Sequence, residues 1–173
     1  IRASQFIPKF AKGLKDDQET FGIKLIGGDL TSSLKHINIT ITIFGETSKS
    51  KSISRDGAKI GDCLYVSGIL GLSKIGLDNF NSKYECFQEA KLKYLLPQPR
   101  VDLGISLKNI ANSMIDISDG LIQDATHLAK NSNLSIEIDI DKLPLPNFTI
   151  LNKSTILNSA LYGGDDYELL FSC

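Results

Sequence analysis

The stretch that most constrains the fold is residues 114–130, which read MIDISDGLIQDATHLAK. Its first four residues form a short β-branched run, which predicts a buried strand. Asp119 stands where a helix N-cap is expected, with Gly120 behind it. A helical pattern of apolar residues follows, at Leu121, Ala125, Leu128 and Ala129. The stretch therefore predicts a strand that runs through a tight turn straight into a helix.

Two carboxylates, Asp116 and Asp119, lie at the end of this predicted strand with the Ser118 hydroxyl between them. In a strand, Asp116 points to the same face as Met114 and Ser118, and a carboxylate on a partly buried face needs a cation or donors. Carboxylates beside free backbone N–H groups are suited to hold Mg²⁺ against a phosphate. The alternative is a helix N-cap and a strand-end turn without a ligand, which is sufficient for Asp119 alone.

The first part of the chain predicts one helix and two strands. Residues 3–21 read as an amphipathic helix ended by Gly22, because Phe6, Phe10 and Leu14 recur at helical spacing with lysines opposite. A short strand is predicted over 23–26. A clearer one is predicted over 37–44, where isoleucines alternate with polar residues as in a half-buried antiparallel strand. The polar stretch 45–61, rich in Ser, Lys and Gly, predicts a domain boundary.

The rest of the chain mixes strands with helices, which indicates an α/β fold or an α+β fold with mixed sheets. Strands are predicted over 63–67, 114–117 and 134–141, helices over 69–77, 84–96 and 101–112, loop over most of 142–159, and an apolar run over 167–171. Glu137, Asp139 and Asp141 form an acidic row on one face of the third strand. A solvated sheet face explains that row more simply than a metal site.

Composition argues against several classes of function. With 42% apolar residues, 23% charged residues and a net charge of -1, no excess of positive charge indicates nucleic acid. No apolar run approaches the roughly 18 to 20 residues that a membrane span needs, and no signal peptide is visible. Cys63, Cys86 and Cys173 are far apart without C-x-x-C spacing, which indicates reduced, buried thiols in a cytosolic protein. Because the chain begins on Ile1 and stops in an apolar run, we expect a fragment lacking both ends.

Three turns share one design, a strand followed by glycine and aspartate. They are Gly27-Gly28-Asp29, Asp116-Ile117-Ser118-Asp119-Gly120 and Gly163-Gly164-Asp165-Asp166. Glycine lets backbone N–H groups approach a phosphate oxygen, and aspartate supplies oxygen ligands for Mg²⁺. None of the turns matches a P-loop or a dinucleotide fingerprint. Taken together they predict a site for magnesium and phosphate.

Nucleophilic and zinc chemistry find little support. The two histidines, His36 and His127, are far apart, and His127 on its predicted helix is expected to pack or face solvent. No serine lies in a G-x-S-x-G elbow, and no histidine pair offers zinc ligands.

As a set, the motifs resemble the thiamine-monophosphate kinase family of the aminoimidazole ribonucleotide synthetase superfamily. The matching segments, in the family's order, are Gly27-Gly28-Asp29-x-Thr31, residues 55–62 (RDGAKIGD), 64–68 (LYVSG), Pro99-Arg100-Val101, 114–121 (MIDISDGL) and 163–171 (GGDDYELLF). They run along nearly the whole chain and are highly specific together. The resemblance implies a truncated two-domain α/β architecture like that of aminoimidazole ribonucleotide synthetase.

The resemblance also implies an activity, in which Mg·ATP phosphorylates thiamine monophosphate to thiamine diphosphate. The acceptor phosphate is already anionic, so this chemistry needs cations between repelling phosphates more than a strong base. By resemblance, several Mg²⁺ ions are bound: Asp29 and Asp116 ligate Mg²⁺ that bridges the phosphates, and Asp119 ligates a further Mg²⁺. Contacts to ATP are made by Gly28, Asp29, Arg55 and Ser118. Asp165 stands where the family has a glutamate on the thiamine substrate. The shorter Asp165 leaves room for a bridging water. Leu30 replaces a threonine usual after Gly-Gly-Asp.

Domains and partners follow from the same resemblance. Residues 1–50 are expected to end an N-terminal domain for ATP binding and dimerisation, and 51–173 to begin a substrate domain. The whole protein is expected to be a cytoplasmic homodimer, and this chain alone to be inactive. Two alternatives remain open: another ATP-using enzyme of the superfamily, of the purine-ligase, selenophosphate or hydrogenase-maturation type, or a non-catalytic nucleotide-binding module.

Overall fold

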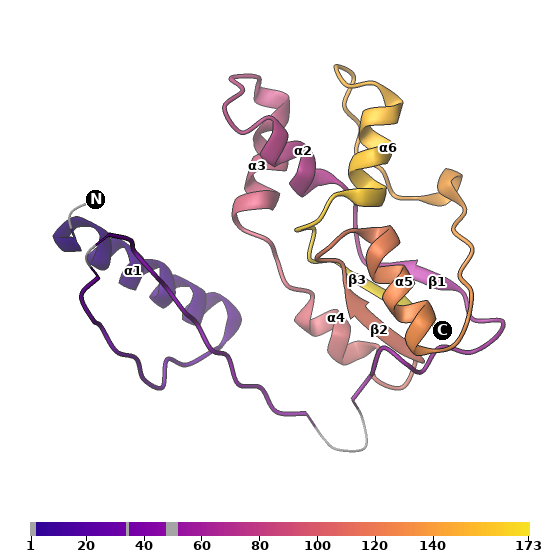
Figure 1. Ribbon diagram of the computed structural model, residues 1–173, viewed down its shortest axis with the longest axis horizontal. Helices are drawn as coiled ribbons and strands as arrows, with labels where there is room; N and C mark the ends of the chain where they lie inside the picture. The colour runs from indigo at the N-terminus through magenta and orange to yellow at the C-terminus, as the bar shows by residue number, and fades with distance from the viewer. Residues whose placement is uncertain (1–2, 34, 48–51) are drawn as a thin grey trace. The chain divides into compact units, whose positions relative to one another are not determined.

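The computed structural model describes residues 3–33, 35–47 and 52–173 (Figure 1). It divides into two units, Ile1–Gly45 and Glu46–Cys173. No helix in the described part is long and apolar enough to cross a membrane.

The first unit is built on helix α1, Ala3–Phe21, with the bounds that the apolar spacing predicts. Phe6 and Phe10, one turn apart, stack with their ring centroids 5.8 Å apart. On the exposed side, Lys12 pairs with Asp16 at 2.5 Å, and such pairs one turn apart add a few tenths of a kcal/mol, about 0.2–0.5, to an isolated helix. The amphipathic pattern is therefore realised as a helix with an aromatic stripe.

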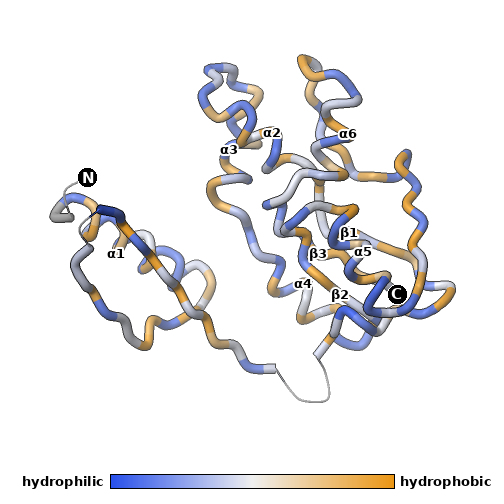
Figure 2. The backbone as a smooth tube through the Cα atoms, in the orientation of Figure 1, coloured by the Kyte–Doolittle hydropathy of each residue, from blue (hydrophilic) through white to orange (hydrophobic). Residues whose placement is uncertain are grey.

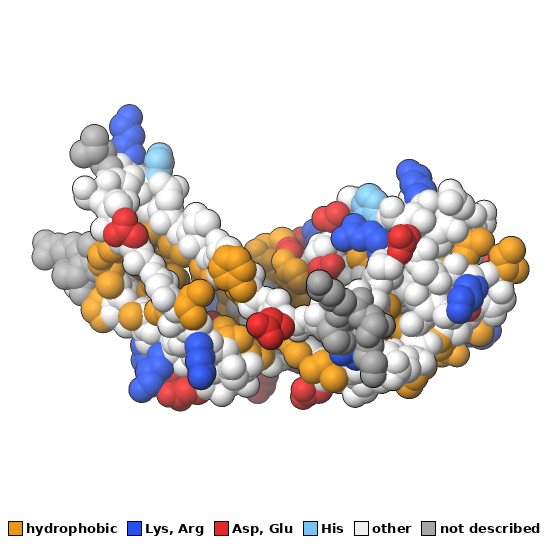
Figure 3. Space-filling model, turned by 90° about the horizontal axis from the view of Figure 1, so that it is seen from below, with side chains coloured by type: hydrophobic (Ala, Val, Ile, Leu, Met, Phe, Trp, Pro, Cys, Tyr) orange, Lys and Arg blue, Asp and Glu red, His pale blue; other side chains and the backbone are white. Residues whose placement is uncertain are grey.

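The two strands predicted in this unit, over 23–26 and 37–44, are wrong as paired strands: within 22–33 and 35–47 the structure contains no strand. Most isoleucines of the second segment stay largely exposed, as Ile41 and Ile43 show at 60% and 74%. Hydrophobic side chains reach the surface in this unit and in the other (Figure 3). Alternation predicts a face to be buried, but a strand also needs a neighbour to take its hydrogen bonds, and the described residues supply none here.

The second unit is centred on a three-stranded antiparallel sheet in the order β1-β3-β2. Its strands are β1 (Leu64–Val66), β2 (Ser113–Asp116) and β3 (Leu169–Ser172). Each lies inside or within a residue or two of a predicted strand or apolar run. In the register, Ile115 is opposite Leu170, and Met114 and Asp116 are opposite Phe171 and Leu169. Asp116 thus shares a face with Met114, as the alternation predicts.

The core lies on one face of this sheet, under helix α5, Leu121–Asn131 (Figure 1). In Figure 2 the tube has the colour of hydrophobic residues along parts of β2 and β3. The core cluster comprises Leu70, Ile115, Ile117, Leu121, Ala125, Leu128, Ala160 and Leu170. Ile117 and Leu170 are fully buried, and each such side chain contributes about 1.5–3 kcal/mol through removal from water. This core fixes the end of β2 and the start of α5.

A second cluster joins helices α2 (Leu72–Asp78) and α3 (Gln88–Leu95) through Ile75, Phe87 and Ala90. The predicted helix 84–96 begins instead as a 3₁₀ turn, Glu85–Phe87, before α3. The predicted helix 101–112 is shorter, since α4 spans Val101–Ser106.

Two expectations for the later chain are wrong. The segment 134–141 pairs with no strand in the described residues and ends in a 3₁₀ turn, Ile140–Lys142, in which the Asp139 side chain accepts from the N–H of Asp141. The region expected to be mostly loop contains α6, Lys153–Tyr162, whose N-cap Asn152 accepts from the N–H of Thr155 at 2.7 Å. Asn152, a favourable N-cap residue, was the feature of the sequence that could have predicted this helix. Of the acidic row, Glu137 and Asp139 lie outside any helix or strand, and Asp141 lies in the 3₁₀ turn.

Candidate functional site

The loop between β2 and α5 is held by one carboxylate. Asp124, 2% exposed in the first turn of α5, turns its Oδ2 back to the loop. That atom accepts from the backbone N–H groups of Ser118, Asp119 and Gly120 at 3.1, 3.0 and 3.1 Å. Burial raises the pKa of the Asp124 carboxyl, and the backbone N–H groups offset this only in part. The loop conformation is therefore built around a buried acid.

The N-cap predicted at Asp119 is wrong. The cap position is Gly120, with φ of 117°, a conformation open to glycine and strained for other residues. A Cβ there would lie 3.0 Å from the backbone of Tyr162. The Asp119 side chain instead accepts from Gln123 Nε2 at 2.9 Å and remains exposed.

The segment 163–168 lies directly against this loop. The N–H of Asp165 donates to the Ser118 carbonyl at 2.9 Å, and the N–H of Tyr167 donates to the Ile117 carbonyl at 2.9 Å. Gly164 is needed at this contact, because a Cβ would stand 2.5 Å from the Ser118 oxygen. Two of the three predicted Gly-Asp turns are therefore brought together.

Acidic side chains gather around Tyr167 at this junction. The Tyr167 hydroxyl donates to Asp165 Oδ1 at 3.2 Å. Burial raises the pKa of Tyr167, and the charges of Asp165, Asp116 and Asp119 raise it further. Asp165 and Tyr167 both have positive φ, 64° and 48°. Such non-glycine residues cost about 1–3 kcal/mol each and are concentrated at functional sites.

The donor set fits a divalent cation in its chemistry. Asp116 and Asp119 are exposed carboxylates, and neither forms an ion pair with the described lysines and arginines. Hard oxygen atoms of this kind are what Mg²⁺ prefers. Across residues 3–33, 35–47 and 52–173, however, no three His, Cys, Asp or Glu side chains form a group that could hold a metal ion. The second unit thus offers two ligands.

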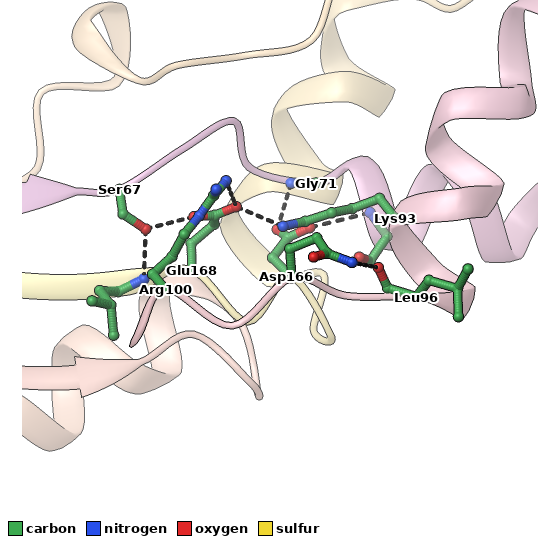
Figure 4. A network of polar contacts seen from close by, with 10 residues as sticks. Ser67, Gly71, Lys93, Leu96, Arg100, Asp166 and Glu168 are labelled. Atoms are coloured by element: carbon green, nitrogen blue, oxygen red, sulfur yellow. Dashed lines mark hydrogen bonds and ion pairs between the residues drawn. The ribbon is translucent and has the colours of Figure 1, made fainter. Parts of the chain in front are cut away.

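A network of ion pairs and hydrogen bonds around the buried Glu168 holds the same segment (Figure 4). Glu168, 1% exposed, accepts from Arg100 Nε and Nη2 at 2.8 and 2.9 Å, from Lys93 Nζ at 2.5 Å and from Ser67 Oγ at 2.5 Å. Burial alone would raise the pKa of Glu168, but the hydrogen bonds from Arg100, Lys93 and Ser67 outweigh it and lower the pKa to about 2. Glu168 is therefore an ionised anchor.

Asp166, fully buried, anchors the start of α2. Its carboxylate accepts from the N–H groups of Gly71 at 2.6 Å and Ser73 at 3.1 Å. Burial raises its pKa against the opposing effect of these bonds. Of the three acidic residues in the segment 163–168 (GGDDYE), Asp166 and Glu168 therefore stabilise the fold. Asp165 is the one left to contact the loop 117–120.

The remaining predicted residues lie elsewhere. Gly28 and Asp29 belong to the first unit and are exposed, and Asp29 Oδ1 accepts from the N–H of Leu30 at 2.8 Å. Arg55 is exposed in a turn before β1, and its carbonyl accepts from Ser132 Oγ at 3.5 Å. The structure thus brings Asp116, Ser118, Asp119 and Asp165 together. Arg55 lies elsewhere, at the contact with Ser132.

Sequence reasoning missed the three acids that hold the site together, Asp124, Asp166 and Glu168. Asp124 had a signal, since an acid in the first turn of a helix can reach back to the N–H groups before it. For Glu168 no local signal exists, because its partners lie 68 to 101 residues away in sequence.

Comparison with known proteins identifies the class. Residues 59–172 match the family model described as AIR synthase related protein, C-terminal domain. The chain therefore belongs to the AIR synthase-related family, and the expected α/β class with an architecture like that of aminoimidazole ribonucleotide synthetase is confirmed.

Within that class the resemblance to thiamine-monophosphate kinases is confirmed. The chain is 38% identical to the thiamine-monophosphate kinase of Aquifex aeolicus over 96% of its length and 56% of the relative's. It is 38% identical to that of Haemophilus influenzae, over 96% and 52%. The solved structure of AaThiL complexed with AMPPCP and TMP matches at a TM-score of 0.82 with 31% identity, covering 99% of this chain and 57% of the other. The chain spans about half the length of these relatives.

Proposed function

We propose that the whole protein transfers the γ-phosphoryl group of ATP to the phosphate of thiamine monophosphate, giving thiamine diphosphate and ADP. A phosphate oxygen of the acceptor attacks the γ-phosphorus as the bond to the leaving ADP oxygen breaks. The observation that carries the proposal is the junction of 117–120 with 163–168, where backbone hydrogen bonds set Asp165 against Ser118, between the exposed carboxylates of Asp116 and Asp119 in sequence. Similarity to AaThiL, solved with AMPPCP and TMP, supports both substrates.

In this proposal the whole protein would bind several Mg²⁺ ions, with Asp29 and Asp116 as ligands to magnesium between the phosphates and Asp119 as a ligand to a further ion. When bound, magnesium neutralises the charge of phosphate oxygens that would otherwise repel one another. Ser118 contributes to ATP binding through its hydroxyl, because its N–H already donates to Asp124. The backbone of this loop is thereby excluded as a phosphate cradle, and the side chains carry the binding.

Asp165 positions the thiamine substrate, with its ring partner Tyr167 fixing the carboxylate by a hydrogen bond. No general base is assigned, because the acceptor oxygen is already anionic at neutral pH. Gly28 and Arg55 are proposed to contact ATP, Arg55 through its phosphates.

The domain assignment follows the same proposal. Residues 1–50 belong to an ATP-binding and dimerisation domain, and 51–173 to a substrate domain, in a homodimeric enzyme. ATP use and three free cysteines favour a cytoplasmic location.

The test is an assay of the whole protein with ATP, Mg²⁺ and thiamine monophosphate, run beside aminoimidazole precursors of purine synthesis. We expect thiamine diphosphate and ADP only from the first mixture. Asp116→Asn is expected to lower kcat by at least about 100-fold, with little rescue by excess ATP, because a cation ligand is lost. Asp141→Asn, an exposed acid of the 3₁₀ turn, is the matched control and should retain full activity. Full activity of Asp116→Asn would contradict the proposal.

A further inference from the structure

Two cysteines that are 110 residues apart in sequence stand directly opposite each other in the sheet. The N–H of Cys63 donates to the Cys173 carbonyl at 2.8 Å, and the N–H of Cys173 donates to the Cys63 carbonyl at 3.1 Å. This reciprocal pair continues the β1–β3 register, in which Leu64 is opposite Ser172. Cys63 and Cys173 are free thiols, as expected, but the fold brings them side by side, which their spacing in sequence did not indicate.

Both side chains are on the sheet face away from the core. Tyr65 and Phe171, two residues along on the same face, stack at 5.6 Å. The pKa of Tyr65 is raised mainly by its electrostatic interaction with Cys63, and further by Cys173. Cys63 is exposed and Cys173 is half-buried, which corrects the expectation of buried thiols. A reagent in water can reach at least one of the two.

The separation suits a covalent bond between them. Residues that exchange both backbone hydrogen bonds have Cα atoms about 5.5 Å apart. Disulfides need about 4.4–6.8 Å between Cα atoms, while their Cβ atoms must approach more closely than in an unlinked cross-strand pair. The bond can therefore form with a small local shift. A disulfide that is exposed and formed under such a constraint is readily reduced again.

We propose that Cys63 and Cys173 form a reversible dithiol site, which closes to a disulfide by exchange with low-molecular-weight disulfides. The thiolate of the exposed Cys63 attacks one sulfur of the reagent, RSSR, and releases RS⁻. The Cys173 thiolate then attacks the Cys63 sulfur of the mixed disulfide and releases the second RS⁻. Two protein thiols are oxidised, one reagent disulfide is reduced to two thiols, and the protons leave to water or to RS⁻. The bond fastens β1 to β3, the strand that follows the 163–168 segment.

The test uses the whole protein with oxidised glutathione, followed by alkylation, peptide mapping and thiol counting under denaturing conditions. We expect alkylatable thiols among Cys63, Cys86 and Cys173 to fall from three to at most one, with the peptides of Cys63 and Cys173 joined and released by dithiothreitol. Cys86, exposed at the 3₁₀ turn before α3, is the internal control and should carry glutathione or stay free.

Single variants make the result decisive. In Cys173→Ser, glutathione should accumulate on Cys63, because no second thiol resolves the mixed disulfide, whereas Cys86→Ser should still form the internal bond. Separate glutathione adducts on Cys63 and Cys173 in the unchanged protein would overturn the proposal. So would an absence of reaction at both, or crosslinking of either to Cys86 as readily as to each other.

Discussion

Single buried acids, together with the glycines beside them, decide the shape of the candidate site. Asp124 accepts hydrogen bonds from three backbone N–H groups that would otherwise lack an acceptor within the turn. Glu168 accepts from two cationic side chains and one hydroxyl. Each acid is buried, with an exposed fraction of 2% for Asp124 and 1% for Glu168. Removing either one leaves polar groups without partners, which costs more than the hydrogen bonds contribute net.

Asp124→Ala is expected to lower the free energy of unfolding by about 2–3 kcal/mol, because up to three N–H groups lose their acceptor. In the whole protein it should also weaken ATP binding, since the loop that presents Ser118 and Asp119 is no longer held. Urea unfolding and ATP titration check the two effects. Gln123→Ala, one residue away and exposed, should change stability by less than about 0.5 kcal/mol. Equal stability of both variants would contradict the role assigned to Asp124.

Glu168 makes stability depend on pH with a defined sign. Its pKa is about 2 in the folded chain against 4.5 unfolded, so its contribution is present above pH 4.5 and is lost as pH falls towards 2. The shift corresponds to on the order of 3 kcal/mol. Asp124 and Asp166 have raised pKa values and act with the opposite sign, so the comparison must be with a variant.

Glu168→Gln is therefore expected to destabilise the protein at pH 7 by about 3–5 kcal/mol, because Arg100 and Lys93 lose their carboxylate. The difference between the two proteins should shrink as pH falls below 4.5. Urea midpoints from pH 7 to pH 3 measure it. A difference that stays constant with pH would show that Glu168 is not the titrating group.

At the scale of elements, local patterns predicted helices better than strands. Helix α1 begins and ends where the spacing of Phe6 and Phe10 predicts, because a helix satisfies its own backbone. Residues 37–44 have an equally clear pattern but no partner in the described chain. The tight α2–α3 contact depends on one small residue that no pattern marks, Gly76, where a Cβ would stand 2.1 Å from the Ala90 oxygen.

Gly76→Ala is expected to destabilise the second unit by about 1–3 kcal/mol, since α2 and α3 must move apart. Gly104→Ala in α4 is the matched control. Its Cβ would meet only Leu169 Cδ1, at 3.7 Å, so the better helix propensity of alanine should raise stability by about 0.5–1 kcal/mol. Chemical denaturation of the two variants should give opposite signs, and the same sign in both would contradict the packing argument.

At the scale of the whole molecule, the chain corresponds to about half of each relative's length. Many large apolar side chains are exposed in both units, as Ile26 at 84% and Ile60 at 92% illustrate. The described residues bring together two predicted metal ligands from the second unit and no group of three. Mg²⁺ at such sites is bound by one or two carboxylates together with water and substrate phosphates, and the remaining half of the relatives' length has no counterpart in this chain to complete the binding of both substrates.

We therefore expect this chain by itself to bind Mg·ATP weakly and to form no measurable thiamine diphosphate, whereas the whole protein does. Calorimetric titration with Mg·ATP and a product assay on both proteins test this. Turnover by the chain alone would contradict this expectation.

The sequence by itself determined the family, the helix α1, and the strand–turn–helix that carries Asp116, Ser118 and Asp119, because these depend on local spacing and on motifs read in order. Only the tertiary structure decided which acidic side chains are exposed and able to bind a ligand, and which are buried and stabilise the fold. It set Asp165 against Ser118, buried Asp166 and Glu168 among donors from distant segments, and placed Cys63 opposite Cys173. The reason is physical: burial and pairing depend on what the fold brings near a side chain, and neither is encoded in its neighbours along the chain.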